Sequence, residues 1–500
     1  MPRAATPTFV CELPLALSGA GERRLQIRLD CARQVYNAVL GESLKRLGLL
    51  RQSKAFQVAQ TIPKRSKEQQ RERAAAFRAL DAQFRLREYD LHAYAVQFGR
   101  SWLSEHLDAN TIQTVASRAW NAVRQYQFGV RGRPRFRGKG QFHSVEGKTN
   151  KQGIRWRDGV VIWGDLRLRA RISADDPVIA HALTCPIKYV RIVRRTLNGR
   201  VRFFAQLICA GKPYQKPQNV VGDGVIGIDP GPSTFGIAGA DWGTQVDLAT
   251  PLQMSRQKQR QLQRRIDRQR RANNPQNYLP DGRVRPGPKR WAISQNQCDS
   301  EWRLTEAKRK EVAHRKSLHG QLANTILRLG HDIRIEKNSY KSFQKSFGKA
   351  VGLSAPATFV AVLSRKAESA GASVTVIPTS LRLSQTCLCG TIARKTFPSA
   401  STAAIVVLRC SGTCSRPILR ASPSPWMGLL VRPGGSMRIR PAWPGRVPNR
   451  ASRRRRDRST SRPSRPGRAS NPRAALPMGT PTCCPLWTAG RSGSSGKLAR

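Results

Sequence analysis

Two acidic residues, each at the end of an apolar run, are the first candidates for chemistry. The run 225–228 leads into Asp229, and a Pro/Gly turn and a second apolar run follow it. The segment 332–335 leads in the same way into Glu336, about a hundred residues later. A carboxylate fixed at a strand end can hold a divalent cation rigidly. The alternatives are a turn Asp before Pro-Gly and an ordinary exposed Glu at a strand end.

Two carboxylates on separate strands suit phosphodiester hydrolysis with two metal ions. In such sites the ions lie roughly 4 Å apart, activate water and stabilise the leaving oxygen. The sequence therefore predicts Mg²⁺ or a similar divalent cation at Asp229 and Glu336. Sites of this kind usually use more than two carboxylates, and the sequence offers only these two in this context.

Two basic segments are candidates for binding nucleic acid. The first is a Gly/Pro-rich loop that contains one aromatic residue among its cations, a composition that suits tracking of a phosphate backbone. The second is a predicted helix over 251–271 in which few acids balance the arginines. The alternatives are a solvated loop and a solvated helix face. The candidate cations are Arg131, Arg133, Arg135, Arg137 and Lys139 in the loop, and Arg256, Arg260, Arg264, Arg265 and Arg268 in the helix.

The composition of the whole chain points to a polyanionic partner. The 500 residues carry a formal net charge of +59, and a charge of this size favours nucleic acid over a membrane surface. We find no apolar run near the length of a membrane span and no signal peptide, so we expect a soluble, cytoplasmic protein. The 11 cysteines show no regular framework, which is typical of reduced thiols.

The elements that must position these residues fall into two groups. Residues 25–128 show helical periodicity, with Leu29, Ala32, Tyr36, Val39 and Leu40 on one face. Residues 154–210 alternate as an antiparallel β unit, a small barrel or sandwich, with a hairpin turn at Asn198-Gly199. After a linker at 211–221, a strand hairpin, helices, a strand ending in an acid, a helix and a further strand follow. That order predicts a mixed α/β sheet with acids at its strand ends.

The sequence resembles the TnpB (OrfB-type) transposon protein family over about residues 25–397. The resemblance depends on the order and spacing of the segments 227–231, 314–319, 333–337 and 383–390. It implies a RuvC-like, RNA-guided DNA endonuclease with an RNase H fold, a zinc ribbon, and a guide RNA from the transposon end. It also implies a prokaryotic, cytoplasmic and nucleoid-associated protein. By this resemblance Asp229 and Glu336 are the first two catalytic, Mg²⁺-binding acids.

The resemblance also implies a multidomain α/β organisation. Residues 1–24 and 129–215 correspond to a β-barrel "wedge", and 25–128 to a helical recognition insert. Residues 222–385 correspond to the RuvC-like nuclease domain with its mixed sheet, and 386–400 to a remnant of the zinc ribbon. Residues 401–500 correspond to no part of the family, and we predict a disordered tail there.

The C-terminal part departs from the family pattern. Where a Cys-x-x-Cys pair is expected, the chain has Cys387-x-Cys389, a spacing that suits tetrahedral Zn²⁺ poorly. Residues 401–500 hold 19 Arg and 1 Lys against a single acid, Asp457, together with 13 of the chain's 32 prolines. The family's Gln-Arg-Asp motif, which carries the third catalytic acid, does not occur. We therefore expect little or no cleavage by this chain.

A frameshift between about codons 385 and 410 is our hypothesis for this change. One permitted set of codons for residues 410–417, read in another frame, encodes Gln-Arg-Asp-Val-Phe-Ser-Ala. Resequencing from codon 380 to beyond codon 420 tests the hypothesis, because no such motif in any frame would contradict it. The rival interpretation of the tail is a basic, disordered segment that binds nucleic acid. The rival functions for the chain are a nuclease-dead RNA/DNA-binding protein or pseudogene product, and a basic structural protein of the ribosomal kind.

Overall fold

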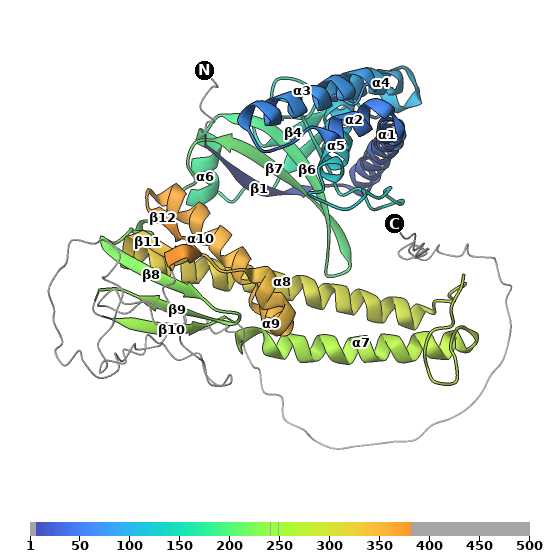
Figure 1. Ribbon diagram of the computed structural model, residues 1–500. Coiled ribbons are helices and arrows are strands. Elements are labelled where there is room, and N and C mark those ends of the chain that lie inside the picture. Colours follow the sequence, from blue (N-terminus) through green and yellow to red (C-terminus); the bar gives the residue numbers. More distant parts are fainter. Residues whose placement is uncertain (1–6, 241, 249, 382–500) are drawn as a thin grey trace, which may run out of the picture. The chain divides into compact units, whose positions relative to one another are not determined.

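The computed structural model describes residues 7–381 except 241 and 249 (Figure 1). The predicted zinc-ribbon remnant with Cys387 and Cys389, and the predicted tail, lie outside the described residues. The described part contains two β-sheets, each with its own core and its own helices. Short 3₁₀ turns occur at Val96–Arg100, Trp102–Glu105, Pro217–Asn219, Thr250–Leu252, Pro275–Asn277 and Thr379–Leu381.

The first sheet is antiparallel throughout and has seven strands in the order β2-β6-β7-β1-β5-β4-β3. Its central strand β1 pairs along most of its length with β7, and its last two residues pair with β5. The strands are β1 (Thr8–Ala16), β2 (Ser144–Glu146), β3 (Arg155–Arg157), β4 (Val160–Trp163), β5 (Leu166–Ala170), β6 (Ile187–Leu197) and β7 (Arg200–Ala210). The predicted antiparallel β unit is confirmed as a curled sheet. The β-barrel stays a prediction, because no ladder joins the edge strands β2 and β3 within the described residues.

Two tight turns set the register of this sheet. Asn198 and Gly199, between β6 and β7, have φ of 49° and 77°. Asp158 and Gly159, between β3 and β4, have φ of 44° and 81°. Positive φ at both central residues defines the two-residue turn that matches the twist of antiparallel strands. The hairpin predicted at Asn198-Gly199 is confirmed, with Leu197 paired to Arg200.

A group of helices follows β1 and packs with the first sheet in one apolar core. The helices are α1 (Gly19–Gln52), α2 (Lys54–Thr61), α3 (Lys67–Gln83), α4 (Glu88–Ala95) and α5 (Ala109–Gln127), with α6 (Pro177–Thr184) between β5 and β6. The predicted start of the helical region at 25 is wrong by about one and a half turns. Ser18 caps α1 by accepting a hydrogen bond from the Gly21 amide, so the Gly-rich segment forms the first helical turn. The apolar stripe predicted on α1 lies in the core.

The second sheet is mixed and has five strands in the order β10-β9-β8-β11-β12. The first three in sequence form an antiparallel meander, whereas β11 runs parallel to β8 and β12 parallel to β11. The strands are β8 (Gly224–Pro230), β9 (Thr234–Ala238), β10 (Gly243–Asp247), β11 (Gly330–Glu336) and β12 (Ser373–Ile377). The predicted mixed α/β sheet is confirmed. Edge strand β10 was missed, because Gly-Thr-Gln-Val-Asp carries little apolar signal.

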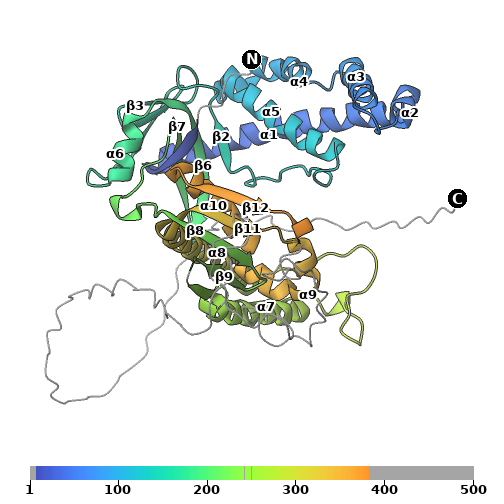
Figure 2. The same ribbon diagram turned by 60° about the vertical axis from the view of Figure 1, so that its left-hand side comes forward.

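Four helices complete this part of the chain: α7 (Gln253–Asn273), α8 (Gln295–Leu329), α9 (Tyr340–Ser354) and α10 (Pro356–Ala370). Helices α8 and α10 cover one face of the sheet, where Ala323, Ile326, Phe359 and Leu363 pack against strand isoleucines (Figure 2). Beyond the sheet α8 continues beside α7 as a long helical hairpin (Figure 1). Helix α9, which the sequence analysis did not predict, contains two glycines and a kink at Phe347, which hide its helical period.

No single helix among the described residues is long and apolar enough to cross a membrane. The pair α9 and α10, which is bent by 53°, passes the same test only by combined length and composition. The apolar face of α10 packs on the sheet, with Phe359, Leu363 and Ala367 fully buried. Core packing therefore accounts for the hydropathy of α10.

Candidate metal site and basic surfaces

The second sheet brings Asp229 and Glu336 together. In the parallel pair of β8 and β11, Ile228 lies opposite Ile335, and each is followed directly by one of the two acids. Side chains alternate along a strand, so both acids point away from the face on which the isoleucines are buried. Asp229 is exposed and Glu336 is half-buried. Two carboxylates thus lie side by side at the carboxyl ends of adjacent parallel strands.

The electrostatics of the pair show how close the two groups are. Burial, the charge of Asp229 and a hydrogen bond with the Asp229 side chain together raise the pKa of Glu336 above its usual range. Burial and the same Asp229 charge raise the pKa of the Tyr340 phenol, at the start of α9. A hydrogen bond between two carboxyl groups needs one proton between them, because two ionised acids at contact distance repel each other. A bound cation would remove that repulsion.

The turn after β8 is held from three directions. The Gly231 amide donates to the Thr234 carbonyl at 2.9 Å, and a Cβ at position 231 would lie 2.7 Å from that oxygen, so only glycine fits. Asn338 Nδ2, two residues after Glu336, donates to the Pro230 carbonyl at 3.0 Å. Ser354 Oγ, at the end of α9, donates to the Pro232 carbonyl at 2.6 Å. The strand end that carries Asp229 is therefore fixed to the elements that follow Glu336.

Two side chains of helix α8 hold the end of α9, and so support the turn after β8. His319 Nε2 lies 2.9 Å from the Ser354 carbonyl, and Arg315 donates to the carbonyls of Gly352 and Leu353 at 3.2 Å each. His319 is almost fully buried, and that burial lowers the pKa of its imidazole. Both residues belong to the segment 314–319 that contributed to the resemblance. Their visible role is to hold the junction of α9 and α10, which in turn holds the turn after Asp229.

The donor set fits a hard divalent cation and leaves its coordination incomplete. Carboxylate oxygens are the ligands that Mg²⁺ prefers, and one or two carboxylates with water and substrate phosphate are a common Mg²⁺ site. Within residues 7–381, leaving out 241 and 249, no group of three or more His, Cys, Asp or Glu side chains is placed to hold a metal ion. The expected zinc ligands Cys387 and Cys389 lie outside the described residues. Residues that the sequence analysis missed are Tyr340, Asn338 and Ser354, and their only sequence signal is nearness to Glu336 or to a helix end.

The basic loop 131–139 lies along α1. Asn37 Nδ2 donates to the Arg137 carbonyl at 2.9 Å, and the Arg137 amide donates to Asn37 Oδ1 at 2.8 Å. The Arg33 guanidinium also donates to the Arg137 carbonyl, at 3.3 Å. The guanidinium groups of Arg131, Arg133 and Arg135 are exposed, and no hydrogen bond or ion pair within the described chain engages them. The backbone of the loop is therefore fixed while its cations remain available to a ligand.

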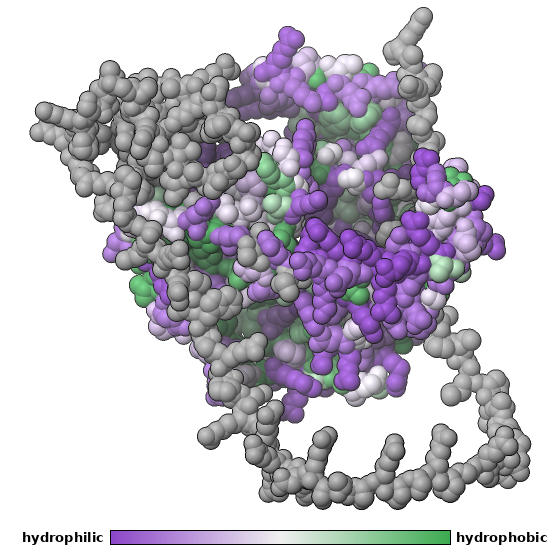
Figure 3. All heavy atoms as spheres, turned by 90° about the horizontal axis from the view of Figure 1, so that it is seen from below, coloured by the Kyte–Doolittle hydropathy of each residue, from purple (hydrophilic) through white to green (hydrophobic). Residues whose placement is uncertain are grey.

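The predicted cations of the second basic segment lie on α7. Arg260, Arg264, Arg265 and Arg268 are exposed, and the part of the chain that the structure describes gives them no acidic partner. Arg256 is half-buried. Hydrophilic side chains gather over this helix in the view from below (Figure 3). Helix α7 thus presents a row of unpaired positive charge to solvent.

Comparisons with known proteins give limited similarity. No protein-family model and no curated protein matches the sequence. A solved Cas12f1–sgRNA–target DNA complex is 13% identical, with 77% of this chain and 92% of that chain covered at a TM-score of 0.39. A CRISPR-Cas12f ternary complex is also 13% identical and covers 75% of each chain at a TM-score of 0.27. TM-scores at this level do not establish a common fold, so they carry no argument about the site.

Proposed function

We propose that this chain is a TnpB-like, RuvC-like relative of RNA-guided DNA endonucleases, with the second sheet as an RNase H-like nuclease domain. One observation carries the proposal: Asp229 and Glu336 meet at the carboxyl ends of adjacent parallel strands. The sheet supports it, since a meander of three strands is extended by two parallel strands beside the first of them. The exposed arginines of α7 and of the loop 131–139 support nucleic acid as the substrate.

In this proposal Asp229 and Glu336 would hold Mg²⁺. A divalent cation bound there would activate water and stabilise the leaving oxygen of a phosphodiester. The half-buried Glu336, whose pKa is raised, must lose its proton before it can act as a ligand, because the ionised carboxylate is the form that binds a metal ion. Asn338, Ser354 and the α8 side chains that hold the turn act as positioning residues. The DNA and a guide RNA would lie along the unpaired arginines, in the cytoplasm of a prokaryote and near its nucleoid.

We further propose that the chain, as its sequence stands, cleaves little or no DNA. The Gln-Arg-Asp motif and the zinc-ligand spacing of the family are missing from residues 382–500. The test combines the purified full chain with its guide RNA, Mg²⁺ and a matched duplex. Efficient cleavage would contradict the proposed inactivity. In a version whose frame is restored between codons 385 and 410, cleavage that Glu336→Gln abolishes would support the proposed site.

The second candidate is a nuclease-dead RNA/DNA-binding protein or pseudogene product. The observation in its favour is that the cations of the loop and of α7 are unpaired regardless of the state of the carboxylate site. Binding of guide RNA that is sequence-selective and resists salt would support this candidate. Binding that salt abolishes equally for all sequences would leave only non-specific attraction by charge.

A further inference from the structure

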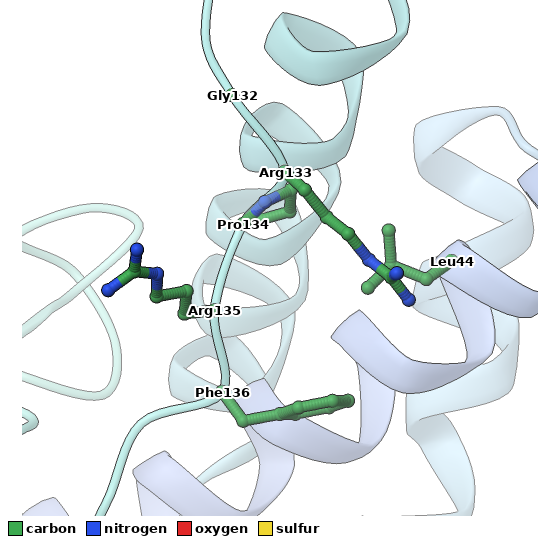
Figure 4. Close-up of a pocket in the computed structure, with 6 residues that line it drawn as sticks. All are labelled: Leu44, Gly132, Arg133, Pro134, Arg135 and Phe136. Atoms are coloured by element: carbon green, nitrogen blue, oxygen red, sulfur yellow. The ribbon is translucent and has the colours of Figure 1, made fainter. Parts of the chain in front are cut away.

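A hollow beside the loop 131–139 is not explained by phosphate tracking. Residues Leu44, Gly132, Arg133, Pro134, Arg135 and Phe136 line an open hollow of about 530 Å³ between the loop and α1. Arg133 and Phe136 extend from the loop toward the side of Leu44, whereas Arg135 extends to the opposite side (Figure 4). The hollow thus has a guanidinium and a phenyl ring at its sides and an aliphatic side chain nearby. No acidic residue lines it.

The phenyl ring of Phe136 is exposed although it is held in place. It is 57% exposed, and the next residue is clamped to Asn37 through the two hydrogen bonds of the Arg137 backbone. The ring lies against α1 at Gly41, where an added Cβ would be 3.6 Å from Phe136 Cε1. Pro134 restricts the backbone between the two side chains further. A large apolar ring kept in solvent by a fixed backbone is a ready surface for stacking.

We infer that this hollow binds one unpaired nucleobase of a single-stranded nucleic acid, stacked on Phe136, with Arg133 on the base or its adjacent phosphate. Every base has a π face, and stacking on exposed aromatic rings is how proteins bind single strands with little sequence preference. A guanidinium can donate hydrogen bonds to a base edge or a phosphate and can also lie over an aromatic ring. A paired base inside a duplex cannot reach such a surface. The inference rests on the proposed nucleic-acid-binding function and adds a base-binding subsite to it.

The test uses the full chain and a short single-stranded oligonucleotide that carries one 2-aminopurine, in EDTA. Fluorescence of 2-aminopurine falls when the base stacks, so it separates base binding from phosphate binding. We expect quenching with single-stranded RNA and with single-stranded DNA, and none with the duplex. The tighter of the two single strands identifies the source of the base. Quenching that is equal for the duplex, or abolished equally by a polyglutamate peptide and by an unlabelled single strand, would overturn the inference.

Variants then separate stacking from charge. Phe136→Ala should weaken binding roughly 5- to 150-fold and abolish quenching, with the salt dependence unchanged. Phe136→Trp should retain both, and Phe136→Leu, which keeps apolar bulk without a π face, should behave as Phe136→Ala. Because Phe136 is exposed, the unfolding midpoint should not change in any of them. If Phe136→Ala bound the oligonucleotide and quenched its fluorescence as strongly as the wild type does, the inference would be overturned.

Arg135→Gln is the matched control for Arg133→Gln, since the two arginines belong to the same loop and extend in opposite directions. Each should reduce the salt slope by roughly 0.7 if it contacts one phosphate of a single strand. Only Arg133→Gln should also reduce quenching at saturation. Indistinguishable behaviour of the two variants would mean phosphate tracking alone. Since no metal is present, failure here is distinct from failure of the carboxylate site, which concerns Mg²⁺-dependent cleavage.

Discussion

The first sheet with its helices and the helix α7 of the second region use arginine in different ways. In the first sheet and its helices, three arginines pair with acids: Arg195 with Glu12, Arg191 with Glu146 and Arg124 with Asp81. The arginines of the loop 131–139 are the exception there. On α7, four arginines are exposed without an acidic partner in the described chain. A net charge therefore does not say which cations are free. Burial and the position of the few acids decide which arginines stabilise the fold and which can bind a polyanion.

The interiors of the two regions differ as well. The first sheet and its helices share an apolar core built from leucine, valine and alanine. Between α7 and α8, the side chain of Gln259 donates to Glu311 Oε2 at 2.5 Å, and both residues are under 9% exposed. Asn274 and Asn277 are buried at the far end of the hairpin. The hairpin interior thus contains buried polar contacts such as Gln259–Glu311, and losing one partner of such a contact costs more than the contact itself contributes.

The largest expected effect is on nucleic-acid binding. Replacing Arg260, Arg264, Arg265 and Arg268 with Gln should lower affinity for single-stranded nucleic acid roughly 10²- to 10³-fold at 0.1 M salt, if each contacts one phosphate. The salt slope should fall by roughly 2.8 on the same assumption. Affinity measured over a salt series checks both. Replacing the acid-paired Arg191, Arg195 and Arg124 instead should leave the slope unchanged. An equal loss in both sets would contradict the distinction between paired and unpaired arginines.

The next effect is on stability. Arg28, on α1, has a side chain only 6% exposed; it donates to the Trp163 carbonyl at 2.5 Å, pairs with Asp165 and lies over the Trp163 ring. Arg28→Ala should lower the free energy of unfolding by about 2–3 kcal/mol, because it orphans the carbonyl and removes packing. Asp165 is largely exposed and remains solvated. Denaturant unfolding measures this. Arg268→Ala, the control on α7, should change stability by less than about 0.5 kcal/mol.

A smaller effect tests the polar interface of the hairpin. Glu311→Leu alone should destabilise the protein by about 1–3 kcal/mol, because it leaves the buried Gln259 amide with only Ser255 as a side-chain partner. Gln259→Leu combined with Glu311→Leu should cost less than the sum of the two single losses, since neither side chain is then left without the other. The Arg315 guanidinium, 3.9 Å from Glu311, loses that ion pair in both Glu311 variants, so the cycle cancels its contribution. A double-mutant cycle gives the coupling energy. If the losses of the two single variants simply added in the double variant, the coupling energy would be zero, and the contact between Gln259 and Glu311 would not contribute to stability.

The smallest effect concerns the two like charges. At neutral pH Glu336→Gln should stabilise the metal-free protein by about 0.2–1 kcal/mol, the scale of a cross-strand contact between charges. Because the pKa of Glu336 is raised in the folded state, wild-type stability falls as pH rises from the usual carboxyl range through that raised pKa. The variant lacks this loss, so the two should converge below about pH 3, where Glu336 is protonated in both the folded and the unfolded state.

Thermal unfolding across pH, without and with Mg²⁺, measures this difference. Added Mg²⁺ should stabilise the wild type and not Glu336→Gln, which reverses their order. Asp332→Asn is the matched control, because Asp332 on the same strand pairs with Arg334 at 2.8 Å and meets an opposite charge. It should not stabilise the protein at any pH. Equal behaviour of the two variants would show that the Asp229 charge does not act on Glu336.

Local patterns in the sequence determined most of the elements. The Asn198-Gly199 turn needs φ values that few residue pairs adopt, and the apolar stripe of α1 has one face to bury. Apolar runs that end on Asp229 and Glu336 were enough to predict that both acids lie at strand ends. Where local signals were weak or conflicting, as at α9, β10 and the start of α1, the elements were missed or misplaced. The β-barrel stays a prediction, since spacing along the chain does not say whether edge strands meet.

Only the tertiary structure decided which of these residues act together. Asp229 and Glu336 are about a hundred residues apart, and their contact depends on β11 inserting parallel to β8 in one register, because a slip of one residue would put one acid in the core. The same holds for Phe136 and Leu44, which share a hollow because Asn37 fixes the loop on α1. Sequence periodicity reports which face of an element is buried. Which elements become neighbours depends on long-range packing, which no short stretch of sequence contains.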